Sequence, residues 1–94
     1  MRLDKYLKVV KVFKRRTLAT EAAKMGFVSI NGRIVKASHN VEVGDIIELS
    51  TDLFYKKIKV LNIPMEGHSI KSLEEYVQII LDERKNVQNE GKIF

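Results

Sequence analysis

The chain has 94 residues, a formal net charge of +5 and no cysteine, and 45% of its residues are hydrophobic. This is the length of one small domain, and the lack of cysteine excludes a disulfide framework and thiolate metal sites. No apolar run is long and uncharged enough to cross a bilayer, and lysines at positions 5, 8 and 11 interrupt the apolar segment that a signal peptide needs. We therefore expect a cytoplasmic protein with no membrane partner.

The positive charge is concentrated at the start of the chain. Residues 1–36 carry ten cations and two acids, a net charge of +8, which leaves −3 for residues 37–94. Such asymmetry indicates a basic front that meets a polyanion and a rear that does not. The alternative is a set of simply solvated lysines. The binding interpretation is favoured because cations lie at helical spacing and directly before a helix start.

The first helix should begin near Arg2 and run to about Lys11 or Phe13. Its apolar residues recur at i, i+4 and i+7, which predicts one inward face. The residues of that face are Leu3, Leu7 and Val10. Lys5 and Lys8 project from the opposite side, and Arg2 lies at the edge between the two sides.

Asp4 lies in the first turn of this helix, where a carboxylate favours the positive end of the helix dipole. Its functional alternative is to orient an arginine, and Arg16 is the natural partner. Acids are common in first turns, so the sequence favours the dipole role.

A basic loop leads into the second helix. The cations of this loop are Lys14, Arg15 and Arg16. They run into Thr17, whose hydroxyl is predicted to cap the helix by accepting a hydrogen bond from a first-turn amide. The helix should cover about residues 17–25 and end at Gly26, which can adopt positive φ. Cations at a helix N-terminus, where the amides and the dipole also favour anions, suit phosphate binding.

The faces of the second helix follow from its spacing. The predicted apolar face is Leu18, Ala22 and Met25. Small residues at 19, 22 and 23 should let the first helix lie across it, forming a compact helical pair.

The middle of the chain reads as strands joined by turns. Asn31-Gly32 is the strongest short-range signal for a two-residue hairpin turn, and Gly44-Asp45 marks another turn. The expected strands are residues 27–30, 33–36, 46–49 and 55–63, with an irregular segment at 37–40 and Pro64 ending the last strand.

The C-terminal part of the chain is predicted to contain a third helix. Ser72 followed by Glu75 reads as a capping box, and apolar residues recur after it at helical spacing. Those apolar residues are Leu73, Tyr76, Val77, Ile80 and Leu81. This predicts a C-terminal helix over about 73–85 with an acidic opposite face, followed by a frayed tail at 86–94.

The basic residues are candidates for RNA contact. Arg15 and Arg16 can grip phosphate oxygens with two parallel N–H donors, which lysine cannot do, and Arg16 lies beside the helix amides. Thr17 could cap the helix or touch phosphate, and capping is favoured. The further candidates are Lys5, Lys8 and Lys14 as phosphate contacts, and Arg33 and Lys36 beside the hairpin. For Arg33 and Lys36, an ordinary solvated strand position is an equal alternative.

Other chemistry is poorly supported. The seven aromatic residues form no interleaved stacking array, which favours recognition of folded RNA shape over single-stranded sequence. His39 and His68 are isolated, and no Gly-rich phosphate loop or nucleophile elbow is present. We expect a non-enzyme with no metal, cofactor or small-molecule substrate.

Four motifs in a fixed order carry a family likeness. They are Arg2-Leu3-Asp4-Lys5, Arg15-Arg16-Thr17, Gly26-x-Val28-x-Ile30-Asn31-Gly32 and Val43-Gly44-Asp45-x-Ile47. With them, residues 1–60 resemble the S-four (S4) RNA-binding domain. The resemblance implies an α+β fold of the alpha-L type, with two short helices packed on a small, bent antiparallel sheet. To this fold we add the C-terminal helix, so that residues 1–62 are the S4 domain and residues 63–94 an extension.

Two groups of short S4 proteins begin almost directly with Met-Arg-Leu-Asp-Lys: the heat-shock S4 proteins and the RqcP quality-control factors. Matches at residues 2–5, 14–17, 29–32 and 36–38 make the chain more similar to the RqcP group. The heat-shock type usually carries a longer, strongly basic tail, whereas a helix with an acidic face is predicted here. The resemblance implies a protein that binds an obstructed large ribosomal subunit, contacts ribosomal RNA and peptidyl-tRNA, and assists RqcH in alanine tailing of the stalled chain. We expect it to be a monomer. The important arginines of the family correspond to Arg2 and Arg16.

Two alternatives stay open. One is a general ribosome-binding factor of assembly or stress, and the other is a protein-interaction module that docks through the acidic C-terminal helix. The RNA-binding interpretation requires Arg2 and Arg16 to lie on the same side of the molecule. It also requires that internal ion pairs do not occupy both of them.

Overall fold

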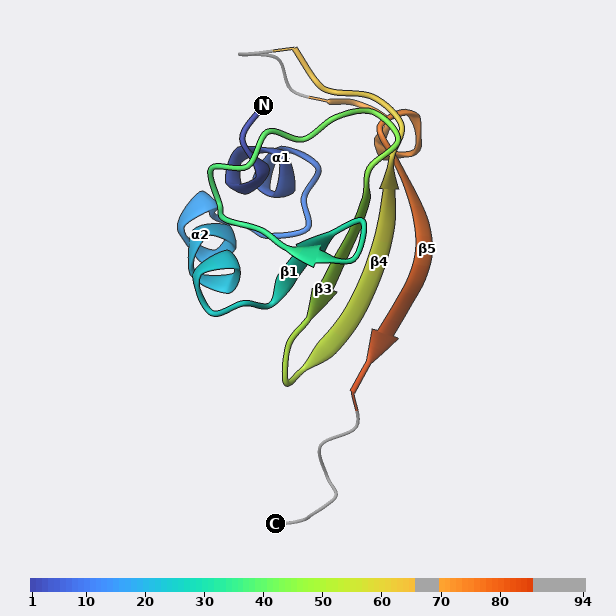
Figure 1. Cartoon of the computed structure of the whole chain (residues 1–94). Helices are drawn as coiled ribbons and strands as arrows, with labels where there is room; N and C mark the ends of the chain where they lie inside the picture. The colour runs from blue at the N-terminus through green and yellow to red at the C-terminus, as the bar shows by residue number, and fades with distance from the viewer. Residues whose placement is uncertain (66–69, 86–94) are drawn as a thin grey trace.

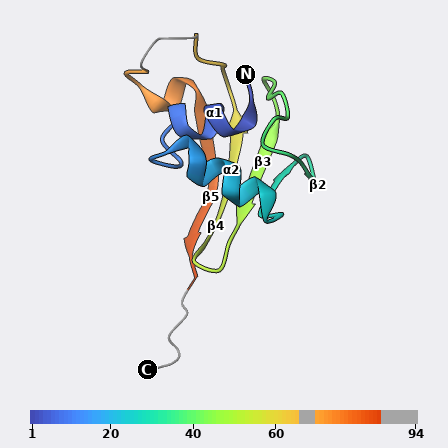
Figure 2. The same ribbon diagram turned by 90° about the vertical axis from the view of Figure 1, so that its left-hand side faces the viewer.

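Two helices lie against one face of a five-stranded antiparallel sheet in the computed structural model, which describes residues 1–65 and 70–85 (Figure 1). This confirms the predicted α+β architecture. Figure 2 views the same arrangement from the helix side, with α1 (Leu3–Val9) and α2 (Arg16–Lys24) in front of the strands. The helix layer therefore carries most of the basic N-terminal segment.

Both predicted helices form, but with shifted ends. α1 stops at Val9, before the predicted end, because Lys11 adopts a positive φ of 65° that no right-handed helix accommodates. α2 begins at Arg16 with Arg15 at the N-cap, and no side chain caps it. The prediction that Thr17 is the N-cap is therefore wrong. Gly26 adopts a φ of 80° just after α2, as predicted.

The small residues of α2 make its contact with α1. Ala19, Ala22 and Ala23 are buried, and the two helices pack against each other. Leu18 and Met25 were expected on the apolar face, but they are 50% and 65% exposed. The packed face is centred on the alanines, so the two larger residues at its flanks remain in solvent.

The strands occupy the sheet in the order β2-β1-β3-β4-β5. Their bounds are Val28–Ile30 for β1, Arg33–Ile34 for β2, Ile46–Ser50 for β3, Phe54–Val60 for β4 and Val77–Arg84 for β5. Asn31 and Gly32 join β1 to β2 with φ of 52° and 86°, the positive values that a type I′ hairpin turn requires, which confirms the predicted turn. The core lies between the sheet and the helices, where Leu3, Tyr6 and Leu7 are fully buried.

The predicted C-terminal helix is wrong. Residues Leu73–Glu75 form one 3-10 turn, and β5 follows and pairs antiparallel with β4 along its whole length. The Ser72 hydroxyl hydrogen-bonds the side chain of Glu74 at 2.6 Å, so the predicted capping box with Glu75 does not form. The β-branched residues of this segment suit a strand, and the edge of β4 supplies backbone partners that a lone helix pattern cannot reveal. The predicted tail at 86–94 lies outside the described residues.

Candidate nucleic-acid interface

The start of α1 is held in place by the irregular segment that precedes Val41. The carbonyl oxygens of His39 and Ala37 accept hydrogen bonds from the first amides of α1, Leu3 N at 2.8 Å and Asp4 N at 3.2 Å. Val41 N donates to Met1 O at 2.9 Å, and the terminal amino group donates to the Asn40 side chain at 2.8 Å. The direction of the first turn, and with it the positions of Arg2 and Asp4, is therefore fixed by backbone contacts.

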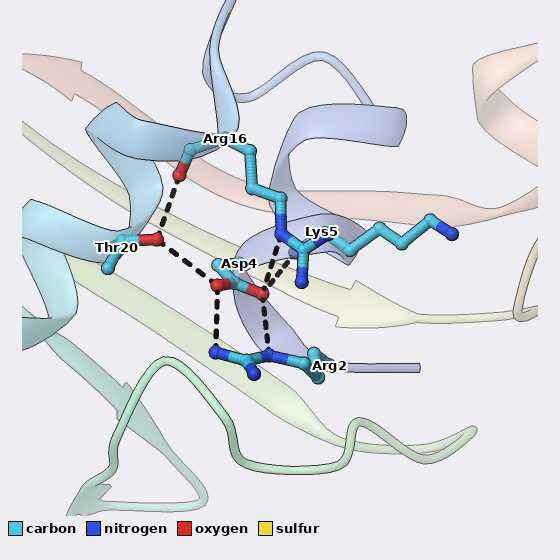
Figure 3. A network of polar contacts seen from close by, with 5 residues as sticks. All are labelled: Arg2, Asp4, Lys5, Arg16 and Thr20. Carbon is cyan, nitrogen blue, oxygen red and sulfur yellow. Dashed lines mark hydrogen bonds and ion pairs between the residues drawn. The ribbon is translucent and has the colours of Figure 1, made fainter.

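Asp4 is the centre of a polar network that joins the two helices (Figure 3). Its side chain is only 3% exposed, and two arginines approach it. Arg2 donates through Nε and Nη2 to the two carboxylate oxygens at 3.3 and 3.2 Å, and Arg16 Nε lies 3.3 Å from Oδ1. Asp4 thus brings the arginines of the first and the second helix together on one side of the molecule.

Two further donors complete the network. The backbone amide of Lys5 donates to Asp4 Oδ1 at 2.8 Å, and the Thr20 hydroxyl donates to Oδ2 at 3.1 Å. The same hydroxyl lies 3.1 Å from the carbonyl oxygen of Arg16, one turn earlier in α2. Thr20 was not among the predicted site residues. The sequence feature that could have pointed to Thr20 is its four-residue spacing from Arg16, which places both side chains on one face of the helix.

The network keeps Asp4 ionised. Burial raises the pKa of its carboxyl, but the hydrogen bonds from Arg2, Thr20 and Lys5 N and the charge of Arg16 outweigh it, and the pKa lies below its usual range. The ionised carboxylate leaves one net positive charge on the group formed by Asp4, Arg2 and Arg16. The arginine-orienting role, the less favoured sequence interpretation, is the one that the contacts support.

Both arginines are ion-paired, and this contradicts one of the two conditions set for the interface. The pairing does not bury them, because the side chains of Arg2 and Arg16 remain 52% and 46% exposed. A guanidinium has five N–H donors, and the contacts with Asp4 use two from Arg2 and one from Arg16. The carboxylate therefore orients two cations whose outer edges still face solvent.

The basic loop before α2 places further candidates beside these arginines. Lys14, Arg15 and Thr17 are exposed, in the loop or in the first turn of α2. Because Thr17 caps nothing, its hydroxyl is available for the phosphate contact considered as its second role. Lys8 is exposed in the last turn of α1, while Lys5 is partly buried and its side chain points away from Asp4 (Figure 3).

The remaining two candidates lie at the far edge of the sheet. Arg33 is exposed in β2, and Lys36 is exposed in the segment that follows it. Lys36 lines the same groove as Thr20, so the candidate residues extend from the arginines toward the hairpin. The structure gives no contact that separates a binding role from simple solvation for Arg33.

The described residues were also considered as possible metal ligands and membrane-spanning segments. In residues 1–65 and 70–85, no group of three or more His, Cys, Asp or Glu side chains could hold a metal ion. His39 is exposed and contributes its backbone carbonyl to α1, and His68 lies outside the described residues. Among the helices described, none has the length and apolarity to cross a membrane.

Comparison with known proteins identifies the family of the chain. The model of the S4 domain family matches residues 1–47, which contain the whole Asp4 network and both helices. The RQC P-site tRNA stabilizing factor of Bacillus subtilis is 42% identical over 85 residues, covering 90% of this chain and 96% of that protein. The corresponding factor of Listeria monocytogenes is 40% identical over 86 residues, covering 89% and 90% of the two chains.

A solved structure shows the same fold. Heat Shock Protein 15 of Vibrio cholerae, described as trimeric, has a TM-score of 0.74 and 29% identity, with 84% of this chain and 80% of that chain covered.

Proposed function

The chain belongs to the S4 domain family, among relatives named RQC P-site tRNA stabilizing factors, and from this premise we propose that it is an RNA-binding factor of ribosome-associated quality control. Its ligand is the obstructed large ribosomal subunit with peptidyl-tRNA, and it contacts both ribosomal RNA and tRNA. It acts in the cytoplasm, as a monomer and without catalysis. In this role it assists RqcH in adding the alanine tail to the stalled chain.

The observation that carries the proposal is the pair of half-exposed guanidiniums on one buried carboxylate. Two oriented forks with a net positive charge suit phosphate oxygens, and held side chains lose less conformational entropy on binding than free ones. Lys14, Arg15 and Thr17 extend the surface over the start of α2. The contacts that this surface offers are to RNA backbone and shape rather than to base sequence.

The proposal predicts a separation of binding from stability. Arg16→Ala should lose association with large subunits, while its free energy of unfolding changes by about 1 kcal/mol or less, because Arg16 is half-exposed and Arg2 still pairs with Asp4. The measurement is co-sedimentation with purified large subunits carrying peptidyl-tRNA, with thermal unfolding as the control for folding. Arg84→Ala is the matched variant, since Arg84 is an exposed arginine on β5. Normal co-sedimentation of Arg16→Ala would contradict the proposal.

The RNA recovered with the protein distinguishes the quality-control role from a general ribosome-binding role. Pull-down of the tagged protein should yield large-subunit RNA together with tRNA and little small-subunit RNA. Equal recovery of both subunits would favour a factor of assembly or stress. The protein-docking alternative has lost its main support, because the acidic helix on which it depended is strand β5.

A further inference from the structure

A groove with an apolar floor lies beside the arginine network. It has a volume of about 460 Å³ and runs between α2 and the segment from Ile34 to Ala37. Ala23, Val35 and Ala37 contribute apolar surface, and Ile34, which is 70% exposed, lines its outer part. The volume is within the range of pockets that hold small ligands.

The polar residues of the groove connect it to the candidate interface. Thr20 lines the groove and also donates to Asp4, so the groove begins where the Arg2–Asp4–Arg16 network ends. Lys24 and Lys36 are exposed lining residues on its two sides, from α2 and from the segment after β2. Among the described residues that line it, none is acidic.

A neighbouring hollow provides a contrast. It shares Val35 with the groove and is lined by one cation, Arg33, and by two acids, Glu42 and Asp45, whose charges would oppose a phosphate. Of these two hollows, the groove beside α2 is the one that combines apolar surface with lysines and with continuity to the arginines. A ligand that matches it has one apolar, flat part and one anionic part.

An unpaired nucleotide has both parts. Resting on the RNA binding proposed above, we infer that this groove takes one unpaired base of the bound RNA, with the flanking phosphates on Lys24, Lys36 and the arginine pair. The base is extruded from its helix and lies against aliphatic rather than aromatic side chains. The arginines then bind backbone, and the groove selects RNA that carries a bulged or looped-out nucleotide.

Two RNA hairpins that differ only by one extra, bulged uridine test the inference with the full chain. The bulged hairpin should bind about fivefold more tightly, the gain expected from burying part of one apolar surface. Ile34→Ser should bring the affinity for the bulged hairpin down to that for the paired one. Val43→Ser is the matched control, since Val43 is 61% exposed outside the groove, and it should keep the preference. Thermal unfolding checks that both variants fold.

The site itself is located by a photo-crosslink. With 4-thiouridine as the bulged base, the linked peptide should contain residues 20–26 or 33–37, and a link to β4 or β5 would overturn the inference. Equal binding of the two hairpins by the unmodified chain, or an unchanged preference in Ile34→Ser, would also overturn it. If Arg16→Ala still weakens both hairpins in that case, the RNA-binding function stands without the groove. Binding of neither hairpin would overturn the groove inference alone, because the RNA-binding function is tested separately by co-sedimentation with large subunits.

Discussion

Asp4 is the residue on which the arrangement of the interface depends. A buried carboxylate is costly unless it is paired, and here four groups from two helices pair with it. The side chains of both arginines lose some conformational freedom, and about half of the surface of each remains exposed to solvent. Solvated cations without a common partner would not keep fixed orientations. Asp4 therefore holds the two guanidinium groups in a defined arrangement.

Replacing the acid should lower stability in a pH-dependent way. Asp4→Asn should reduce the free energy of unfolding at pH 7 by about 1–3 kcal/mol, because the arginines lose a charged partner. The pKa of Asp4 is lowered in the folded state, so its stabilisation is present above the unfolded pKa, near 4, and is lost as the pH falls through the folded value. Chemical denaturation at pH 7 and at about pH 3 should show the gap between the two proteins closing. Asp52→Asn, at an exposed acid, is the control, and a gap independent of pH would contradict the prediction.

The same substitution separates orientation from charge. Asp4→Asn adds one positive charge to the interface, so a binding surface that depends on charge alone would bind RNA more tightly. If orientation of Arg2 and Arg16 matters, the affinity for large subunits should instead fall several-fold. Titration of labelled protein with large subunits at constant salt decides between the two by the sign of the change. Tighter binding would show that Asp4 has no positioning role.

At the scale of elements, β5 shows how pairing with a neighbouring strand can override a helical spacing of apolar residues. A C-terminal helix with the predicted stripe would bury Val77 and Ile80 alike, whereas the strand leaves Val77 5% and Ile80 45% exposed. Val77→Ala should therefore destabilise by about 1–2 kcal/mol and Ile80→Ala by about 0.5 kcal/mol or less. Thermal unfolding of the pair measures the difference, and equal losses would favour the helix.

Sequence reasoning succeeded where the signal is local. Asn31-Gly32 needs positive φ at both positions, and Gly26 needs it after α2, so the hairpin and the helix end were predictable from single residues. The strand β5 was not predictable in this way. In a short apolar segment, spacings of three and four residues also occur by chance when the side chains alternate between the two faces of a sheet. Its state is decided by the open edge of β4, a contact about twenty residues away.

The interface shows the same limit. The nine candidate residues were chosen from charge and position, and their RNA contacts stay predictions. The pairing of Asp4 with Arg16 was suggested from the sequence, and the structure contains that contact. Thr20 could not be predicted in this way, because its role exists only when the start of α1 lies across α2. Local sequence therefore predicts the components of such a network, and the packing of the two helices decides which of them meet.

At the scale of the whole molecule, the sheet separates two surfaces. Most of the basic segment lies in or beside the helix layer (Figure 1). Along β4, Ile58 and Val60 are buried toward the core, so Lys59 between them lies on the other face of the sheet. Eight of the ten cations of residues 1–36 thus lie in α1, in α2, or in the helix ends and loop that flank them. A molecule of this kind should approach RNA with its helices first.

Salt dependence tests that orientation. If the helix side neutralises five to seven phosphates, the logarithm of the association constant for large subunits should fall with the logarithm of salt concentration with a slope of roughly −4 to −6. Lys14→Ala, on the helix side, should make the slope shallower by about one contact, whereas Lys59→Ala, on the opposite face of the sheet, should leave it unchanged. The two variants carry the same change in net charge, so a general charge effect would alter both slopes equally. That outcome, or a slope near zero in the unmodified chain, would show that the helix layer is not the surface that meets the RNA.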